Sequence, residues 1–327
     1  MANAPAPSRS LLFLLVALTA LGEVSTQLII PGLGAIEHAL QAPQGSALMA
    51  LSAFVAAFGL GQLLFGPLSD RIGRRPVLIG GLALYVVATL AMLLVTDIQQ
   101  FIAARVLQGL GACAALVLAR TVVRDVWKAE AGPALALTMI GMLYAIVVAP
   151  IAGGLLIKLL GWRAPIALAL VIGSLVLLLA LLFFRESNHH LDPRAAHWRT
   201  LGGQYLDLLK GRQYRAYAVA LACTYGAMFA VIAGSSAVFI NLLGFSSLEY
   251  GLNFGLIVSM LIVGSTYTRR NIQRLGPQRI VAMGVTMVAV GGVAALAIYL
   301  VFGLSVVGLD IPIALVTGTN GKTTTTS

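Results

Sequence analysis

The sequence predicts an all-α protein that crosses a membrane several times, and its composition is the first reason. Apolar residues make up 59% of the 327 residues, whereas charged residues make up only 10%. A typical soluble domain carries about 25% charged residues, and so few charges could not keep so much apolar surface dispersed in water. The mean hydropathy of +0.96 agrees with a membrane protein. A soluble enzyme is therefore excluded as the starting class.

The second reason is a series of apolar runs, each close to the length of about 20 residues that a membrane-spanning helix needs. The first run contains Glu23 and has no clear small-residue cleavage site, so it is expected to be an uncleaved helix rather than a signal peptide. The predicted spans are 11–30, 46–68, 76–96, 99–119, 134–157, 165–184, 216–240, 250–268 and 280–302.

The basic residues predict the orientation of these spans. The net charge is +10, but the bases form short clusters between apolar runs rather than one basic face, so nucleic acid is not an expected partner. With the N-terminus in the cytoplasm, 17 Arg and Lys residues fall in cytoplasmic segments, against only Lys158 and Arg163 in outer loops. Because basic loops stay on the cytoplasmic side, this asymmetry predicts a multi-pass protein with a cytoplasmic N-terminus.

The longest polar stretch divides the chain into two helical parts. Residues 1–184 are expected to form a bundle of six helices, and 185–215 a cytoplasmic connector. Residues 216–305 then supply about three more helices, and 306–327 form a tail of different character.

Neither the cysteines nor the histidines predict a metal site or a disulfide framework. Cys113 and Cys223 both lie inside apolar runs and are expected to be free thiols. The histidines lack cysteine partners and helical i, i+4 spacing, so no metal and no cofactor is expected.

A charged loop joins the second and third predicted spans. Its Gly and Pro residues suit a tight reversal of the chain, and Asp70 can pair with bases or with a helix N-terminus. On its own, such a loop is a charged turn that fixes topology. The string nevertheless resembles the inner-loop signature G-x-L-x-D-R-x-G-R-R of the major facilitator superfamily. The matching residues are Gly66, Asp70, Arg71, Gly73, Arg74 and Arg75.

Two further stretches carry the same resemblance. Arg105 to Gly109 is similar to the family motif R-x-x-Q-G, and Ala149 to Gly154 is similar to the exporter motif G-P-x-x-G-G, with Ala149 at its first glycine. Together with residues 62–75, 119–125 and 161–163, these stretches look most like the Bcr/CflA-type drug:proton antiporters. The resemblance runs from about residue 10 to about residue 300.

This resemblance implies both a fold and an activity. The fold would be the major facilitator fold, with a complete six-helix N-terminal bundle and about three helices of the C-terminal one. The activity would be proton-coupled efflux of small amphipathic drugs or metabolites across the bacterial plasma (inner) membrane. Such a protein is not an enzyme. Its partners would be the lipid bilayer, the substrate and protons, and it is expected to be a monomer that uses the proton gradient as its energy source.

Two ionisable residues lie well inside predicted spans, where a charge costs about 2.5 to 3.5 kcal/mol or more. Counting residues from the span ends places Glu23 and Arg105 at similar depth. They could form a structural ion pair or be solvated independently. Alternatively, Glu23 carries the proton and Arg105 modulates its ionisation.

Six further positions complete the candidate site. Gln27 lies one turn after Glu23 on the same face, and relatives often carry an acid at this position, four residues before Pro31. Gln108 and Tyr144 are weaker cavity candidates and could simply hydrogen-bond between helices. Pro150, Gly153 and Gly154 would bend a span and allow the two bundles to rock, or would serve close packing alone.

The tail at 306–327 resembles another family. Gly318, Gly321, Lys322 and Thr323 look like the ATP phosphate loop of Mur-type ligases and cyanophycin synthetase, although Val316 occupies the first glycine position of the full motif. No ligase domain surrounds this loop. We expect a transporter of about twelve spans that has lost its last three and acquired an unrelated fragment. The rival hypotheses are a non-transporting remnant and a fragment of an ATP-dependent ligase fusion.

Overall fold

The computed structural model describes residues 9–302 except 129–130, 189–190, 194 and 196–197, and all regular structure in this part of the chain is helical. Besides the α-helices, η1 is a short 3-10 helix and η3 a short π-helix. The elements are α1 (Arg9–Gln27), η1 (Ile30–Gly32), α2 (Leu33–Ala39), α3 (Ser46–Ile72), α4 (Arg74–Leu94), α5 (Ile98–Trp127), α6 (Ala131–Leu160), α7 (Arg163–Phe183), α8 (Trp198–Lys210), α9 (Arg212–Ser236), η3 (Ala237–Leu242), α10 (Ser247–Leu275) and α11 (Pro277–Phe302).

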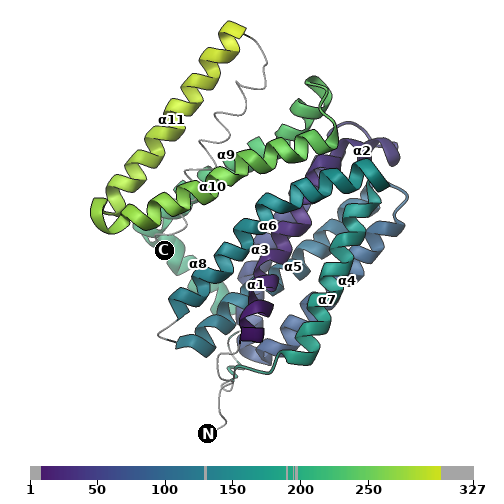
Figure 1. Ribbon diagram of the computed structural model, residues 1–327. Helices are drawn as coiled ribbons and strands as arrows, with labels where there is room; N and C mark the ends of the chain where they lie inside the picture. The colour runs from purple at the N-terminus through teal and green to yellow at the C-terminus, as the bar shows by residue number, and fades with distance from the viewer. Residues whose placement is uncertain (1–8, 129–130, 189–190, 194, 196–197, 303–327) are drawn as a thin grey trace.

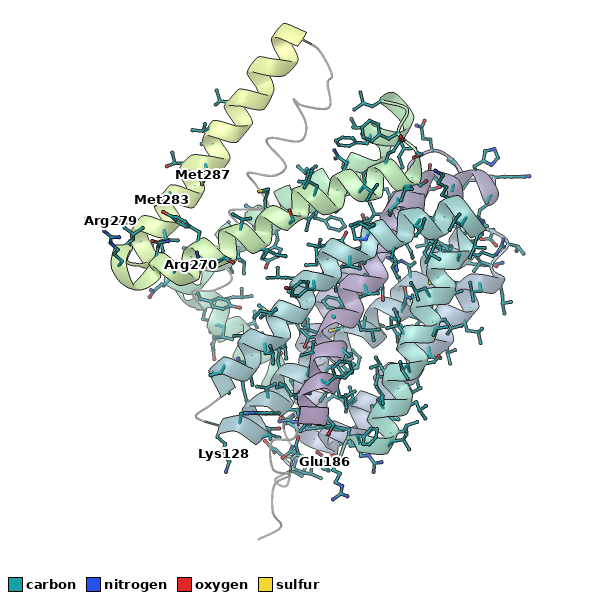
Figure 2. The ribbon with its side chains drawn as sticks, viewed as in Figure 1. Lys128, Glu186, Arg270, Arg279, Met283 and Met287 are labelled. Carbon is teal, nitrogen blue, oxygen red and sulfur yellow. The ribbon has the colours of Figure 1, made fainter. Side chains whose placement is uncertain are left out.

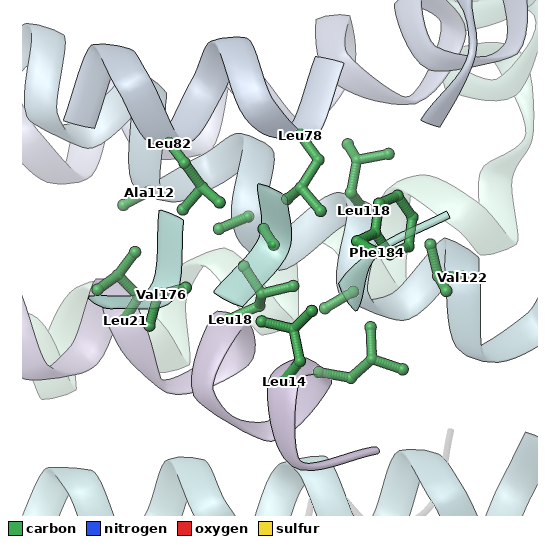
Figure 3. Packing of buried hydrophobic residues seen from close by; sticks show 14 of the residues in the cluster. Leu14, Leu18, Leu21, Leu78, Leu82, Ala112, Leu118, Val122, Val176 and Phe184 are labelled. Carbon is green, nitrogen blue, oxygen red and sulfur yellow. The ribbon is translucent and has the colours of Figure 1, made fainter. Parts of the chain in front are cut away.

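Helices α1 to α7 pack together into one bundle, called the N-terminal bundle below (Figure 1). Helix α5 packs along α3 and α4, and α1 packs against α5, α6 and α7. Figure 3 shows leucines of α1 and α4 meeting apolar side chains of α5 and α7 in the middle of this bundle. These helices form one helical unit, and the predicted composition of six membrane spans stays a prediction.

Local signals explain where these helices begin and end. The Asp97 carboxylate accepts hydrogen bonds from the backbone N–H groups of Gln99 (2.8 Å) and Gln100 (2.9 Å), which caps the start of α5. Gly73 alone separates α3 from α4, with φ at +103°, a conformation that favours glycine. The chain turns between the second and third spans as predicted, but the turn is Gly73 alone, because Gly66 and Pro67 lie inside α3 and Pro76 lies inside α4.

Seven helical segments are long and apolar enough to cross a membrane, counted within the described residues. They are Ser10–Ala39, Ser46–Ile72, Arg74–Leu94, Ile98–Trp127, Ala131–Leu160, Arg163–Phe183 and Ser247–Thr268. The other two predicted spans, 216–240 and 280–302, lie largely on α9 and α11. Neither is among the seven, and Gln278–Val293 of α11 counts as a shorter apolar helix. The number of spans in the second half therefore stays a prediction.

The connector contains a helix that the sequence analysis did not predict. Helix α8 lies inside the polar stretch 185–215, and its Tyr205 hydroxyl donates a hydrogen bond to the backbone carbonyl of Leu63 on α3 (2.8 Å). That carbonyl lacks its usual helical donor because Pro67, four residues later, has no N–H. Tyr205 therefore satisfies a carbonyl that the proline leaves free, and holds the connector against the bundle.

The second half meets the N-terminal bundle mainly where α10 runs beside α6, while α11 extends away from the bundle (Figure 1). Glycines bring the two helix backbones into contact. A Cβ atom at Gly154 of α6 would overlap the Ser247 carbonyl oxygen, and one at Gly251 of α10 would overlap the Pro150 carbonyl oxygen. We call this contact the α6–α10 seam.

Candidate functional site

A buried arginine forms the centre of the candidate site. Arg105 lies on α5 with 1% of its surface exposed. Its Nη1 donates hydrogen bonds to Gln108 Oε1 (2.6 Å) and to the Ser25 carbonyl oxygen (3.3 Å). The guanidinium carbon lies 4.4 Å from the centre of the Phe54 ring on α3, which is cation–π geometry. Three helices therefore surround this charge.

A second layer of neutral polar groups supports Arg105. Gln108 Nε2 donates a hydrogen bond to Thr89 Oγ1 on α4 (2.8 Å), so Gln108 links the arginine to that helix. The Ser25 and Tyr85 hydroxyls share a hydrogen bond of 2.6 Å. The Tyr85 ring has room because a Cβ atom at Gly173 of α7 would overlap it. The result is one polar network inside an apolar bundle, and we call these residues the Arg105 network.

The Arg105 network leaves hydrogen-bonding groups unused. Arg105 Nε and Nη2 are buried and have no hydrogen-bond partner, and no carboxylate pairs with Arg105 within the residues that the structure describes. Gln27 is also buried, with its Oε1 unpartnered. Buried polar groups normally have hydrogen-bond partners, so the unpartnered N–H groups of Arg105 and the unpartnered Oε1 of Gln27 are unusual features of this bundle.

Glu23 does not belong to the Arg105 network. It is half-buried on α1 and forms no hydrogen bond or ion pair with any other described residue. Tyr225 of α9 lies within electrostatic range of the Glu23 carboxylate. The two charges predicted at similar depth are therefore not paired with each other. The role of Glu23 as proton carrier and that of Arg105 as its modulator stay predictions.

The remaining predicted cavity residues lie in different surroundings. Tyr144 on α6 is 61% exposed, so it is not part of the buried network. Gly154 lies at the α6–α10 seam, whereas a Cβ atom at Gly153 would overlap the Leu28 carbonyl oxygen. Pro150 lies inside α6. Close packing is thus visible at both glycines, and the predicted rocking of the bundles stays a prediction.

The charged loop forms a second cluster at one end of the N-terminal bundle. The Arg74 side chain is buried between two acids, pairing with Asp70 one turn before it and with Asp125 on α5 (Nε to Oδ2, 3.1 Å). Its Nη1 also donates to the Ser69 hydroxyl (2.6 Å). The interaction expected of Asp70 with a base is therefore present. Arg71 and Arg75 are exposed. The Gly66 carbonyl oxygen accepts a hydrogen bond from the Ser69 hydroxyl.

Glu186, just after α7, completes this cluster, which we call the Arg74 cluster. Figure 2 shows Glu186 at the same end of the bundle as Lys128. Its carboxylate accepts hydrogen bonds from the backbone N–H groups of Arg74 (2.9 Å) and Arg75 (3.0 Å) at the start of α4. It also accepts hydrogen bonds from the backbone N–H groups of Ser187 and Asn188. Partial burial raises the pKa of the Glu186 carboxyl, but these four donors outweigh burial and hold the pKa below its ordinary value.

Glu186 and Asp125 were not predicted as site residues. Asp125 lies in the stretch 119–125 that carries the family resemblance, whereas the only local signal at Glu186 is a single acid in a basic segment next to an apolar run. The phosphate-loop residues Gly318, Gly321, Lys322 and Thr323 lie outside the described residues.

Comparison with known proteins identifies relatives that match most of this chain. It is 30% identical over 302 residues to a chloramphenicol resistance protein of Pseudomonas aeruginosa, covering 90% of this chain and 70% of that protein. It is 29% identical over 262 residues to multidrug resistance protein D of Escherichia coli (strain K12), covering 80% of this chain and 66% of that protein. The chain therefore spans about two thirds of the length of these relatives.

Solved structures agree on the fold. A bacterial homologue of the human lysosomal transporter Spinster, in an inward-facing and unoccupied conformation, has a TM-score of 0.72 at 16% identity, with 98% of this chain and 76% of that chain covered. A D-xylose-proton symporter has a TM-score of 0.68 at 15% identity, covering 95% and 79%. Residues 12–325 match the family described as Major Facilitator Superfamily. The chain therefore belongs to the major facilitator superfamily, a family of multi-pass membrane transporters.

Proposed function

We propose that this protein exports small amphipathic compounds from the bacterial cytoplasm in exchange for protons. The observation that carries the proposal is Glu23, the one carboxylate in the middle of a membrane-spanning helix within the described residues. A carboxylate at this depth is costly when ionised, so it is retained where its ionisation has a use. Relatives named for chloramphenicol resistance and multidrug resistance support drug-like substrates.

In this proposal Glu23 takes up a proton from the outer side and releases it to the inner side. Tyr225 of α9 lies within electrostatic range of Glu23, and alternating access would expose the carboxylate to each side of the membrane in turn. The 17 basic residues of the loops favour an inner-membrane orientation with a cytoplasmic N-terminus. The Arg74 cluster would then lie on the cytoplasmic side.

Transport by inverted membrane vesicles tests the proposal. Vesicles that contain the full chain should accumulate chloramphenicol when a proton gradient, acidic inside, is imposed, and an uncoupler should abolish accumulation. Glu23→Gln should remove gradient-dependent uptake, because the amide cannot carry a proton. The matched control is Asp207→Asn, which alters an acid that is 72% exposed on α8.

Each outcome separates the hypotheses. Uptake that persists in Glu23→Gln would remove Glu23 as the proton carrier. No uptake by any variant, although each reaches the membrane folded, would favour the non-transporting remnant.

A further inference from the structure

The Arg105 network contains a positive charge that no neighbouring group balances. All its hydrogen-bond partners are neutral, namely the Gln108 amide and the Ser25 carbonyl, and the Phe54 ring that attracts it through its face carries no net charge. A buried charge is normally paired with an opposite charge. Within the described residues, Arg105 lacks that partner although it is among the most buried side chains of the chain.

The unused donors of Arg105 have a particular geometry. A guanidinium has five N–H donors, and Nη1 is engaged with Gln108 and Ser25, whereas Nε and Nη2 have no partner. Nε and Nη2 form one edge of the planar group, and this edge presents two parallel N–H bonds. Such an edge matches the two oxygens of a carboxylate or a similar oxyanion.

Aromatic side chains lie beside this charged group. The Phe54 ring packs against the guanidinium, and the Phe58 ring stacks on Phe54 with centroids 5.9 Å apart. Phe58 in turn lies against Gly22 on α1, next to Glu23. A ligand that carries both an anionic group and an aromatic ring would therefore meet an arginine on α5 and two neighbouring aromatic rings on α3.

We infer that the Arg105 network binds the carboxylate or other oxyanion of an aromatic amphipathic substrate through the Nε and Nη2 edge. This inference rests on the proposed export function, because it names the substrate class of the same site. The site is closed in this structure, so α1 and α3 must separate from α5 to admit the ligand. Binding would then supply the negative charge that the bundle itself does not provide.

Binding of benzoate and of benzamide to the purified full chain tests this inference. The two probes have the same shape, but only benzoate carries a charge. Benzoate should bind about 10-fold or more tightly than benzamide, as expected for hydrogen bonds to charged groups. Arg105→Gln should abolish this preference, and Arg105→Lys should retain part of it, since it keeps the charge but not the bidentate edge.

The matched control is Arg163→Gln. Arg163 also stacks on an aromatic ring, with its guanidinium carbon 4.2 Å from the centre of the Trp162 ring, but its side chain is exposed. This variant should keep the full preference for benzoate. Equal binding of the two probes to the unaltered chain would overturn the inference, as would a preference that survives Arg105→Gln while each variant remains folded by its thermal unfolding profile.

The same measurements separate this inference from the proposed function. Benzoate preference without gradient-driven uptake in vesicles would leave the binding site in place and reject proton-coupled export. Gradient-driven uptake of chloramphenicol without benzoate preference would reject the binding site alone.

Discussion

Two buried arginines in the N-terminal bundle differ in what surrounds their charge. Arg74 has 7% of its surface exposed and pairs with Asp70 and Asp125. Arg105 has 1% exposed and meets only neutral groups within the described residues. The fold itself compensates the first charge but not the second. The comparison indicates that Arg74 serves the structure of the bundle, whereas Arg105 is kept for a partner outside the chain.

The largest expected effect comes from replacing each arginine with methionine, which has similar length and no charge. Arg74→Met leaves two acids without their cation and should lower stability by about 2 kcal/mol, less than for a fully buried ion pair because both carboxylates are partly exposed to solvent. Arg105→Met removes an uncompensated charge, so the thermal midpoint should stay the same or rise. Thermal unfolding of both variants in one detergent measures this difference. A larger loss of thermal stability in Arg105→Met than in Arg74→Met would contradict the distinction drawn between the two arginines.

A smaller effect concerns the pH dependence of the Arg74 cluster. Glu186 has a pKa held below its ordinary value of 4.5 because ionised Glu186 is stabilised in the folded state. Its contribution is therefore complete above about pH 4.5 and is lost as the pH falls through the lowered pKa. Glu186→Gln should lower stability at pH 7 by about 1.5 kcal/mol, typical of hydrogen bonds to a charged group.

The pH profile of thermal unfolding checks this prediction. The difference in thermal midpoint between the unaltered chain and Glu186→Gln should shrink as the pH falls through the lowered pKa of Glu186. In contrast, the difference in thermal midpoint between the unaltered chain and Arg105→Met should stay constant over the same pH range, since no carboxylate pairs with Arg105 within the described residues. If the difference in thermal midpoint caused by Glu186→Gln does not change with pH, the charge of the Glu186 carboxylate does not contribute to stability.

The smallest effect concerns the Leu63 carbonyl, which, like Arg74, is a polar group that the fold satisfies. Tyr205→Phe removes its donor and should raise the rate of tryptic cleavage in the connector about 3-fold, as expected for one neutral hydrogen bond of about 0.7 kcal/mol. Pro67→Ala restores a helical N–H, so Tyr205→Phe should have little further effect in that background. Equal effects of Tyr205→Phe in both backgrounds would show that the hydrogen bond does not hold α8 in place.

The sequence predicted the helices of the first half because apolar runs and glycine turns are local signals. Residues 46–68 were predicted as a span and lie within α3, which continues to Ile72 and ends before Gly73. Helix α8 was missed because the connector has no apolar run of spanning length. Glu186 was missed as a site residue because its partners on α4 lie more than 100 residues earlier in the chain, and a pairing over that distance depends on tertiary packing.

The candidate site was predictable only in part for the same reason. Arg105 and Gln108 stand out as polar residues three positions apart on one helix, and they do interact. Ser25 and Tyr85 come from other helices, and no spacing in the sequence joins them to Arg105. Similar depth could not show whether Glu23 and Arg105 are in contact, because depth leaves the rotation of each helix about its axis undetermined.

The α6–α10 seam has a consequence for the spacing of the two halves. Gly154 and Gly251 bring backbone against backbone, and one turn further along α10 the Ile151 side chain of α6 fills the space beside Gly255. Because a Cβ atom at Gly154 or Gly251 would overlap a carbonyl oxygen, any larger residue at either position would force the two helices apart. The distance between the two halves is therefore set where side chains are missing rather than where they are present.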